Sequence, residues 1–381
     1  MVILKMSGKI KVWVLKNAIM YFTLDSWNPC DTRETKLVCA IVEYQYVKDI
    51  KMYISVLDQS HIPKGGTAEQ ALAATVELAK LTDNLGYHRF WVSEHHNMYS
   101  VAGSSPEVLL GYLASQTKKI RIGSGGVMLP HYSALKVAEN FRILEALAPG
   151  RIDLGVGRAP GGDRLTASLL NPHNHFSEQD FIEQLQDLQG YLSDSLKSES
   201  DKGKVLATPV VKGIPEQWVL SSSGQSGLFA AHLGMAFAFA HFINPNGGAR
   251  AVEVYRNYFK PSEQLRIPRV LVALFMFCSD SKERNEQVKA VLNYRFLQLE
   301  TKGRFDPVTF EEIKDVKYSP AEEQRITFNS HRFAIGTPEE LRKQLTILAD
   351  EYDVNEIMAV NAAFDFEDRL KSYELFSSVF R

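Results

Sequence analysis

The chain has 381 residues, 45% of them hydrophobic, and a formal net charge of -2, which suits a globular protein of one large or two ordinary domains. Its 43 basic and 45 acidic residues are spread evenly and no apolar run reaches membrane-spanning length, so we expect a small-molecule ligand, no nucleic acid and no membrane. Three cysteines, Cys30, Cys39 and Cys278, lack both metal-ligand spacing and the density of a disulfide scaffold, which favours a reducing compartment, the cytoplasm.

Residues 1–51 lack the alternation of strands and helices that begins at Met52. Within them, Lys11–Leu24 is apolar enough to suggest a signal peptide, but Lys16 interrupts the run and no small-residue cleavage pattern follows. We therefore predict an N-terminal extension over 1–51 that is not part of the main domain, and a single domain over 52–381.

The main domain is predicted to repeat one unit, a buried strand followed by an amphipathic helix. In the first unit, Tyr53–Leu57 is strand-like, Thr67 and Gln70 form a capping box, and apolar residues recur at helical spacing until Gly86. Further strands are predicted at Arg89–Ser93, Ile120–Leu129, Ile152–Val156, Gln217–Ser221, Ala236–Phe242, Arg269–Phe277 and Asn355–Val360. Further helices are predicted at Ser105–Thr117, Ser133–Leu147, Ser226–Leu233, Gly248–Tyr258, Lys282–Leu297 and Glu367–Phe380.

These alternating units predict an α/β fold, a (β/α)₈ TIM-type barrel with insertions after strand 4 and before strand 8. The first insertion, Ala159–Glu216, contains a predicted helix near Glu178–Leu192. The second, Glu300–Gly336, precedes a helix over Pro338–Ala349 that completes the seventh unit. Functional groups of such barrels lie where strands end and the following loops begin, so these loop entries are the candidate site.

Strand 2 leads into Ser93-Glu94-His95-His96. Because neighbouring residues of an extended chain face opposite ways, at most one of the two histidines should point into the barrel mouth. Two other interpretations stay open: a zinc site, which the adjacent spacing disfavours, and histidines that merely hydrogen-bond the surrounding loops.

Three further strand ends favour a flat ligand that carries a phosphate. The glycine-rich run Gly123–Pro130 at the end of strand 3 allows close approach of a flat ligand, or marks a bulge at a barrel corner. Arg158 after strand 4 offers a guanidinium to a phosphate, or to a neighbouring carboxylate. The run Ser221–Ser226 before a helix offers hydroxyl and N–H donors, or ordinary helix caps.

Together these segments resemble the bacterial luciferase-like monooxygenase family, from about Met52 to the C-terminus. The segments that carry the resemblance are Ser93–His96, Ile122–Pro130, Ala138-Glu139-Asn140, Gly157-Arg158 and Ser222-Ser223. The resemblance implies an oxidoreductase that uses reduced FMN and dioxygen to oxidise a small, partly apolar organic substrate. It also implies a homodimer, and because the sequence shows no nicotinamide-binding motif, we expect a separate NAD(P)H:flavin reductase to supply the reduced flavin.

The resemblance also implies roles for individual residues. His95 matches the active-site histidine, and we expect it to titrate near neutrality and transfer protons. Gly125 and Gly126 match the position of a non-proline cis peptide beneath the flavin ring. The other cofactor-binding positions are Met128, Glu139 near the ring, and Arg158, Ser222, Ser223 and Ser226 around the phosphate, while Trp91, Glu94 and His96 are predicted to line the substrate pocket.

One departure bears on the reaction: Gly157 stands where luciferases proper carry a reactive cysteine, which favours a monooxygenase that emits no light. Two alternatives remain on the same barrel. One is an F420-dependent oxidoreductase that transfers hydride, and the other is a flavin-binding protein without activity.

Overall fold

The computed structural model describes residues 2–5, 10–15, 18–23, 52–173, 176–197, 199–303, 306–363 and 365–379. The chain divides into two compact units, Met1–Lys51 and Met52–Arg381. In the first unit, β1 (Val2–Lys5), β2 (Ile10–Leu15) and β3 (Ala18–Thr23) form an antiparallel sheet, which the sequence patterns did not predict. Cys30 and Cys39 lie outside the described residues. Among the described helices, none combines the length and apolar character needed to cross a bilayer.

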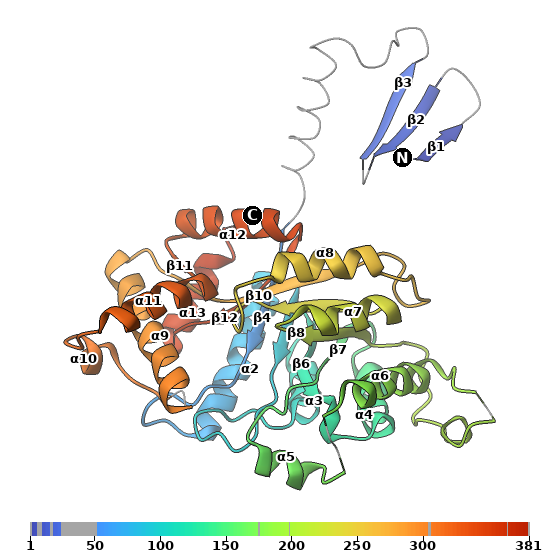
Figure 1. The fold of residues 1–381 in the computed structure, drawn as a ribbon, viewed down its shortest axis with the longest axis horizontal. Helices are drawn as coiled ribbons and strands as arrows, with labels where there is room; N and C mark the ends of the chain where they lie inside the picture. The colour runs from blue at the N-terminus through green and yellow to red at the C-terminus, as the bar shows by residue number, and fades with distance from the viewer. Residues whose placement is uncertain are drawn as a thin grey trace. The chain divides into compact units, whose positions relative to one another are not determined.

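Residues 52–379 form a closed barrel of eight parallel strands surrounded by helices, as predicted (Figure 1). The barrel closes because β10 pairs with both β9 and β12, and β12 pairs with β4. Its strands are β4 (Tyr53–Asp58), β5 (Arg89–Val92), β6 (Arg121–Met128), β7 (Ile152–Gly157), β8 (Glu216–Ser221), β9 (Ala236–Ala240), β10 (Val270–Cys278) and β12 (Glu356–Asn361). The main helices between and after these strands are α2 (Ala68–Leu85), α3 (Pro106–Gln116), α4 (Ala134–Leu147), α6 (Glu178–Ser193), α7 (Gly224–Leu233), α8 (Gly248–Tyr258), α9 (Lys282–Lys302), α12 (Pro338–Tyr352) and α13 (Phe366–Phe376).

Helix α2 shows how local sequence sets the boundaries of an element. The Thr67 side chain accepts a hydrogen bond from the backbone N–H of Gln70, and the Gln70 side chain accepts one from the backbone of Thr67, which completes the predicted capping box. Gly86 ends the helix in the left-handed region at a φ of 76°, where a residue without Cβ is favoured. The six buried positions of α2 face the barrel.

Strand β10 divides its side chains between two cores. Every residue of β10 is buried. Leu271 and Ala273 pack with Trp91 and Met358 inside the barrel, whereas the intervening residue Val272 packs in the layer between strands and helices. Because both faces of β10 are buried, both sets of side chains must be apolar. The sequence of β10 is therefore a continuous apolar run.

The two insertions contain elements that the sequence did not predict. The first holds a short helix, α5 (Arg164–Leu170), ahead of α6. The second holds α10 (Phe310–Ile313), α11 (Pro320–Asn329) and a ninth strand, β11 (Phe333–Gly336), which pairs with β10 over Phe275–Cys278, beyond the section that pairs with β9. These elements have four to ten residues each and lie inside the insertions, where no regular alternation of strands and helices indicated them.

Candidate functional site

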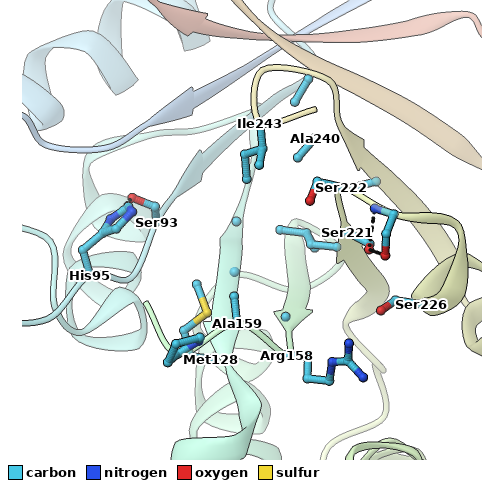
Figure 2. Close-up of a pocket in the computed structure, with 18 of the residues that line it drawn as sticks. Ser93, His95, Met128, Arg158, Ala159, Ser221, Ser222, Ser226, Ala240 and Ile243 are labelled. Carbon is cyan, nitrogen blue, oxygen red and sulfur yellow. Dashed lines mark hydrogen bonds between the residues drawn. The ribbon is translucent and has the colours of Figure 1, made fainter. Parts of the chain in front are cut away.

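A cavity of about 1010 Å³ opens where the barrel strands end. Residues from the ends of β4 to β9, from α5 and from the start of α6 line it, together with side chains from inside the barrel. Figure 2 shows Ser93 and His95 on one side and Arg158, Ser222 and Ser226 on the other. Among the described residues, no group of three or more His, Cys, Asp or Glu side chains is arranged to hold a metal ion.

His95 reaches the cavity from the loop after β5. Its backbone N–H donates to the Gly103 carbonyl oxygen at 2.9 Å, and its Nδ1 lies 3.1 Å from the Ser93 hydroxyl, with either atom able to donate. Among the described residues, Nε2 has no hydrogen-bond partner. The loop therefore fixes the imidazole while one ring nitrogen stays available to a ligand.

The protonation of His95 differs from the expectation drawn from its residue type. Burial, helped by the nearby charge of His96, lowers its pKa to about 4. His95 is therefore neutral at pH 7, in contrast to the expectation that it titrates near neutrality. Burial by the surrounding loops could not be read from the residues themselves.

Glu94 and His96, which were predicted to line the substrate pocket, lie behind its wall. The buried Glu94 carboxylate accepts hydrogen bonds from the Met128 backbone N–H at 2.9 Å, the Tyr132 hydroxyl at 2.8 Å and His96 Nε2 at 2.7 Å. Of these residues, only Met128 lines the cavity. Glu94 thus positions the end of β6 instead of meeting a ligand.

Gly125 and Gly126 form a flat wall of the cavity. The peptide between them is cis, and the register between β6 and β7 shifts by one residue there. A Cβ on Gly125 would lie 2.7 Å from Leu57 Cδ1, and one on Gly126 would lie 2.8 Å from the Gly155 carbonyl oxygen. At Gly126 the obstacle is backbone, so glycine is required there, whereas a Cβ at Gly125 would require the Leu57 side chain to shift. The two glycines leave backbone without side chains at the cavity.

The opposite side of the cavity is rich in hydrogen-bond donors. Ser221, Ser222, Ser223 and Ser226 lie at the end of β8 and the start of α7. Ser223 is the N-cap residue of α7, yet its side chain makes no capping bond and instead lies 3.2 Å from the Ser221 hydroxyl. The first N–H groups of α7 and these hydroxyls are thus gathered at one end of the cavity, an arrangement that suits an anion.

Two arginines reach the same part of the cavity. Arg158 follows β7 and pairs with Glu178, with 3.2 Å between Nη1 and Oε1. Arg164 begins α5, lines the cavity and forms no ion pair with any described residue. Sequence reasoning missed Arg164, and its only signal was a basic residue directly after Asp163, which caps the helix.

The loop that carries Arg158 is fastened to the loop that carries His95. The Asn97 side chain donates to Asp163 Oδ2 at 2.9 Å, and the backbone N–H of His96 donates to the Gly161 carbonyl at 2.9 Å. From the segment after β6, His131 Nε2 also donates to the Pro160 carbonyl at 2.7 Å. The two sides of the cavity mouth are therefore held together by direct hydrogen bonds.

Glu139, predicted to lie near the flavin ring, is placed away from the cavity lining. It lies on α4, where its carboxylate is 3.3 Å from the Thr208 hydroxyl and 3.9 Å from Lys136 Nζ. Helix α4 packs outside the barrel, so a side chain on this face is directed to the first insertion and not to the barrel mouth.

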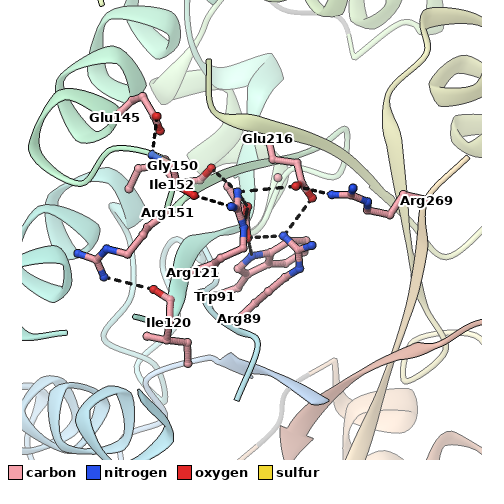
Figure 3. A network of polar contacts seen from close by, with 12 residues as sticks. Arg89, Trp91, Ile120, Arg121, Glu145, Gly150, Arg151, Ile152, Glu216 and Arg269 are labelled. Carbon is pink, nitrogen blue, oxygen red and sulfur yellow. Dashed lines mark hydrogen bonds and ion pairs between the residues drawn. The ribbon is translucent and has the colours of Figure 1, made fainter. Parts of the chain in front are cut away.

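A network of buried charges lies deeper in the barrel, around the starts of the strands (Figure 3). Arg89 Nη1 lies 2.8 Å from Asp153 Oδ2 and Arg89 Nε lies 2.8 Å from Glu356 Oε1, while Arg121 and Glu216 extend the network. Burial alone would lower the pKa of Arg89, but the charges of Asp153, Glu356 and Glu216 outweigh it and raise that pKa. The part of the barrel near the strand starts therefore contains buried charges that are neutralised by ion pairs.

Comparison with known proteins identifies the family. The model described as luciferase-like monooxygenase matches residues 52–351. The "Uncharacterized protein YwcH" of Bacillus subtilis is 45% identical over 86% of this chain and 98% of its own length. The N-acetyl-S-alkylcysteine monooxygenase of the same organism is 38% identical over 85% of this chain and 97% of its own length. The crystal structure of apo-MsnO8 is 34% identical, with a TM-score of 0.78 over 87% of this chain and 98% of that one.

Two more distant structures share the fold with different cofactors. The oxygenating constituent of 3,6-diketocamphane monooxygenase from Pseudomonas putida, in complex with FMN, is 19% identical, with a TM-score of 0.65 over 86% of this chain and 97% of that one. An F420-dependent secondary alcohol dehydrogenase is 14% identical, with a TM-score of 0.59 over 86% of this chain and 98% of that one. At these identities the likeness concerns the fold alone. The barrel, its cavity and the match over residues 52–351 lead to one conclusion: this chain belongs to the luciferase-like monooxygenase family.

Proposed function

We propose that the protein is a monooxygenase that uses reduced FMN and dioxygen to oxidise a small, partly apolar organic substrate. The observation that carries the proposal is the division of the cavity. Gly125 and Gly126 form a bare wall, Arg158 and the serines lie at one end, and His95 lies on the other side.

The cavity residues fit FMN in size and chemistry. The cavity has a volume of about 1010 Å³, at the upper end of the range of about 300–1,000 Å³ for small-molecule sites. A cavity of this size leaves room for a substrate beside a flavin. We assign the ring to the wall of Gly125, Gly126 and Met128, because the two glycines present backbone without side chains to the cavity there. We assign the phosphate to Arg158, Ser222, Ser223 and Ser226, because a dianion needs charged and hydrogen-bonding donors.

Bound reduced flavin supplies the electrons that activate dioxygen. The protein's own contribution is to exclude water and to control a proton. Leu57, Trp91, Leu220 and Met358 supply apolar walls. His95, neutral at pH 7 and held by Ser93, is assigned as the proton acceptor through its unpaired Nε2.

The substrate is assigned to the part of the cavity lined by Phe242, Ile243, Leu271 and Ala273. These side chains come from the end of β9 and from β10, on the opposite side of the barrel from β6. They offer apolar contact and no charge, which favours a substrate with a small apolar group at the reacting end.

The test is to offer the purified protein reduced FMN or reduced F420, with and without candidate substrates, while oxygen consumption is recorded. FMN binding with substrate-stimulated oxygen uptake supports the proposal. Turnover of F420 without oxygen would replace it with hydride transfer. Tight flavin binding without turnover on any substrate would point to a flavin-binding protein that lacks activity.

We also propose a homodimer and a separate NAD(P)H:flavin reductase as partners. Sedimentation equilibrium measures the first. For the second, coupled turnover should require an added reductase when NADH or NADPH is the electron source, and turnover without one would contradict the proposal.

A further inference from the structure

Glu178 is an acidic residue inside the part of the cavity that otherwise gathers donors. It is the first residue of α6, follows the N-cap Ser177, and lines the cavity together with Arg158. Its Oε1 lies 3.2 Å from Arg158 Nη1. Its other oxygen, Oε2, accepts a hydrogen bond from the side chain of Gln225, in the first turn of α7.

The position of Glu178 conflicts with an incoming anion. The Glu178 carboxylate pairs with Arg158 and lies beside the start of α7, which is assigned to the phosphate. A phosphate dianion that engages Arg158 must either displace this carboxylate or share the guanidinium with a like charge at short range. Like charges in one site disfavour each other, so either outcome weakens the binding of the dianion.

We propose, on the basis of the assigned FMN site, that Glu178 is a specificity-determining residue that competes with the flavin phosphate for Arg158. It lowers the affinity for FMN and leaves the affinity for riboflavin, which lacks the phosphate, almost unchanged. A flavin held in this way exchanges readily, which suits a protein that receives reduced flavin from a separate reductase.

The pair is partly open to water, which bounds the size of the effect. The side chains of Arg158 and Glu178 are 30% and 49% exposed. Ion pairs at such exposure are screened, so removal of the carboxylate charge should tighten FMN binding by a modest factor, on the order of 5-fold at low salt.

The substitution that isolates the charge is Glu178→Gln, because glutamine can still accept from Arg158 and keep an amide near Gln225. The matched control is Glu183→Gln. Glu183 lies on the same helix, is exposed, pairs with Gln179 and is not part of the cavity lining. The two variants have the same net charge, so a difference between them reports position and not total charge.

The experiment measures the Kd of FMN and of riboflavin for the full chain and both variants by flavin fluorescence at low and high salt. The expected result is a lower Kd for FMN in Glu178→Gln alone, with riboflavin unchanged and the gain reduced at high salt. Unchanged or weaker FMN binding in Glu178→Gln, or an equal change for riboflavin, would overturn the inference while leaving the proposed function in place. A parent protein that binds neither flavin would overturn both.

Discussion

Trp91 Nε1 donates a 2.9 Å hydrogen bond to Asp153 Oδ2, and this bond joins the cavity wall to the buried charge network below it. Trp91→Phe should keep an apolar wall but remove one donor from a buried carboxylate. The expected loss of stability is about 1.5–3 kcal/mol, measured by urea unfolding.

Trp218→Phe provides the matched control. Trp218 is also fully buried, and its ring centroid lies 5.4 Å from that of Trp91. Its Nε1, however, has no hydrogen-bond partner in the described part of the chain. Both substitutions shrink an indole to a phenyl ring. Equal losses in the two variants would show that packing, and not the bond to Asp153, accounts for the effect.

His95→Ala should retain FMN binding and lose coupled turnover, because His95 lies across the cavity from the donors assigned to the phosphate. If the residue transfers a proton, the loss should be on the order of 10²–10⁴-fold, with oxygen uptake diverted to hydrogen peroxide. Steady-state oxygen and peroxide assays measure both quantities. His96→Ala should spare more of the turnover, since His96 faces Glu94, and parent-like turnover in His95→Ala would remove His95 from the mechanism.

The depressed pKa of His95 predicts a dependence of stability on pH. The folded pKa is about 4, whereas the unfolded value is about 6.5, so the unfolded chain binds more protons between these values. Stability is therefore full above pH 6.5 and falls as the pH drops toward 4. From pH 7 to pH 4.5 the contribution of His95 should decrease by about 2–3 kcal/mol.

Comparison with His95→Gln isolates this contribution, because the pKa values of His61, His88 and His241 are also lowered by burial. Unfolding in urea at several pH values should give a shallower decline for the variant. The same pH dependence of stability in the parent protein and in His95→Gln would mean that burial does not lower the pKa of His95.

Arg158→Ala should weaken FMN far more than riboflavin. Loss of a charge-assisted contact to the phosphate should cost about 1.5–3 kcal/mol of FMN binding free energy, measured by fluorescence titration. Arg164→Ala is the comparison variant, because Arg164 lines the same cavity from α5 and forms no ion pair among the described residues. An equal loss for both flavins would indicate that Arg158 shapes the loop and does not bind the phosphate.

Deletion of residues 1–51 should leave the barrel folded and able to bind flavin. The reason is that the unit beginning at Met52 contains all eight barrel strands and every residue of the cavity lining. Thermal unfolding and flavin titration of a chain starting at Met52 provide the measurement. A lost cooperative transition would mean that the extension stabilises the barrel.

The barrel could be predicted from sequence because its strands and helices carry strong periodic patterns. The eight predicted strands correspond to the barrel strands, and the ends of the helix Gly248–Tyr258 agree to the residue. The predicted helix Glu367–Phe380 corresponds to α13, which ends at Phe376, while Phe380 itself lies outside the described residues.

The site was less accessible to sequence reasoning, because it depends on which way side chains turn after each strand. The extended chain after β5 could send only one histidine to the cavity. Which one depends on Glu94, which accepts from His96 and also from Met128 and Tyr132 of the segment after β6. Glu139 was assigned by position in the family, and the packing of α4 directs it elsewhere. The ion pair between Arg158 and Glu178 joins residues twenty apart through the first insertion, where no periodic pattern indicated the contact.

The one-residue register shift at Gly126 decides which side chains of β6 meet a ligand. In an unbroken strand, Gly125 and Val127 would share a face. Instead Gly126 and Met128 line the cavity with Gly125, while Val127 packs among the helices. A deletion of one glycine should therefore exchange the environments of Val127 and Met128 even though neither residue is altered. At this wall, the spacing of the chain governs ligand contact as much as the identity of its residues.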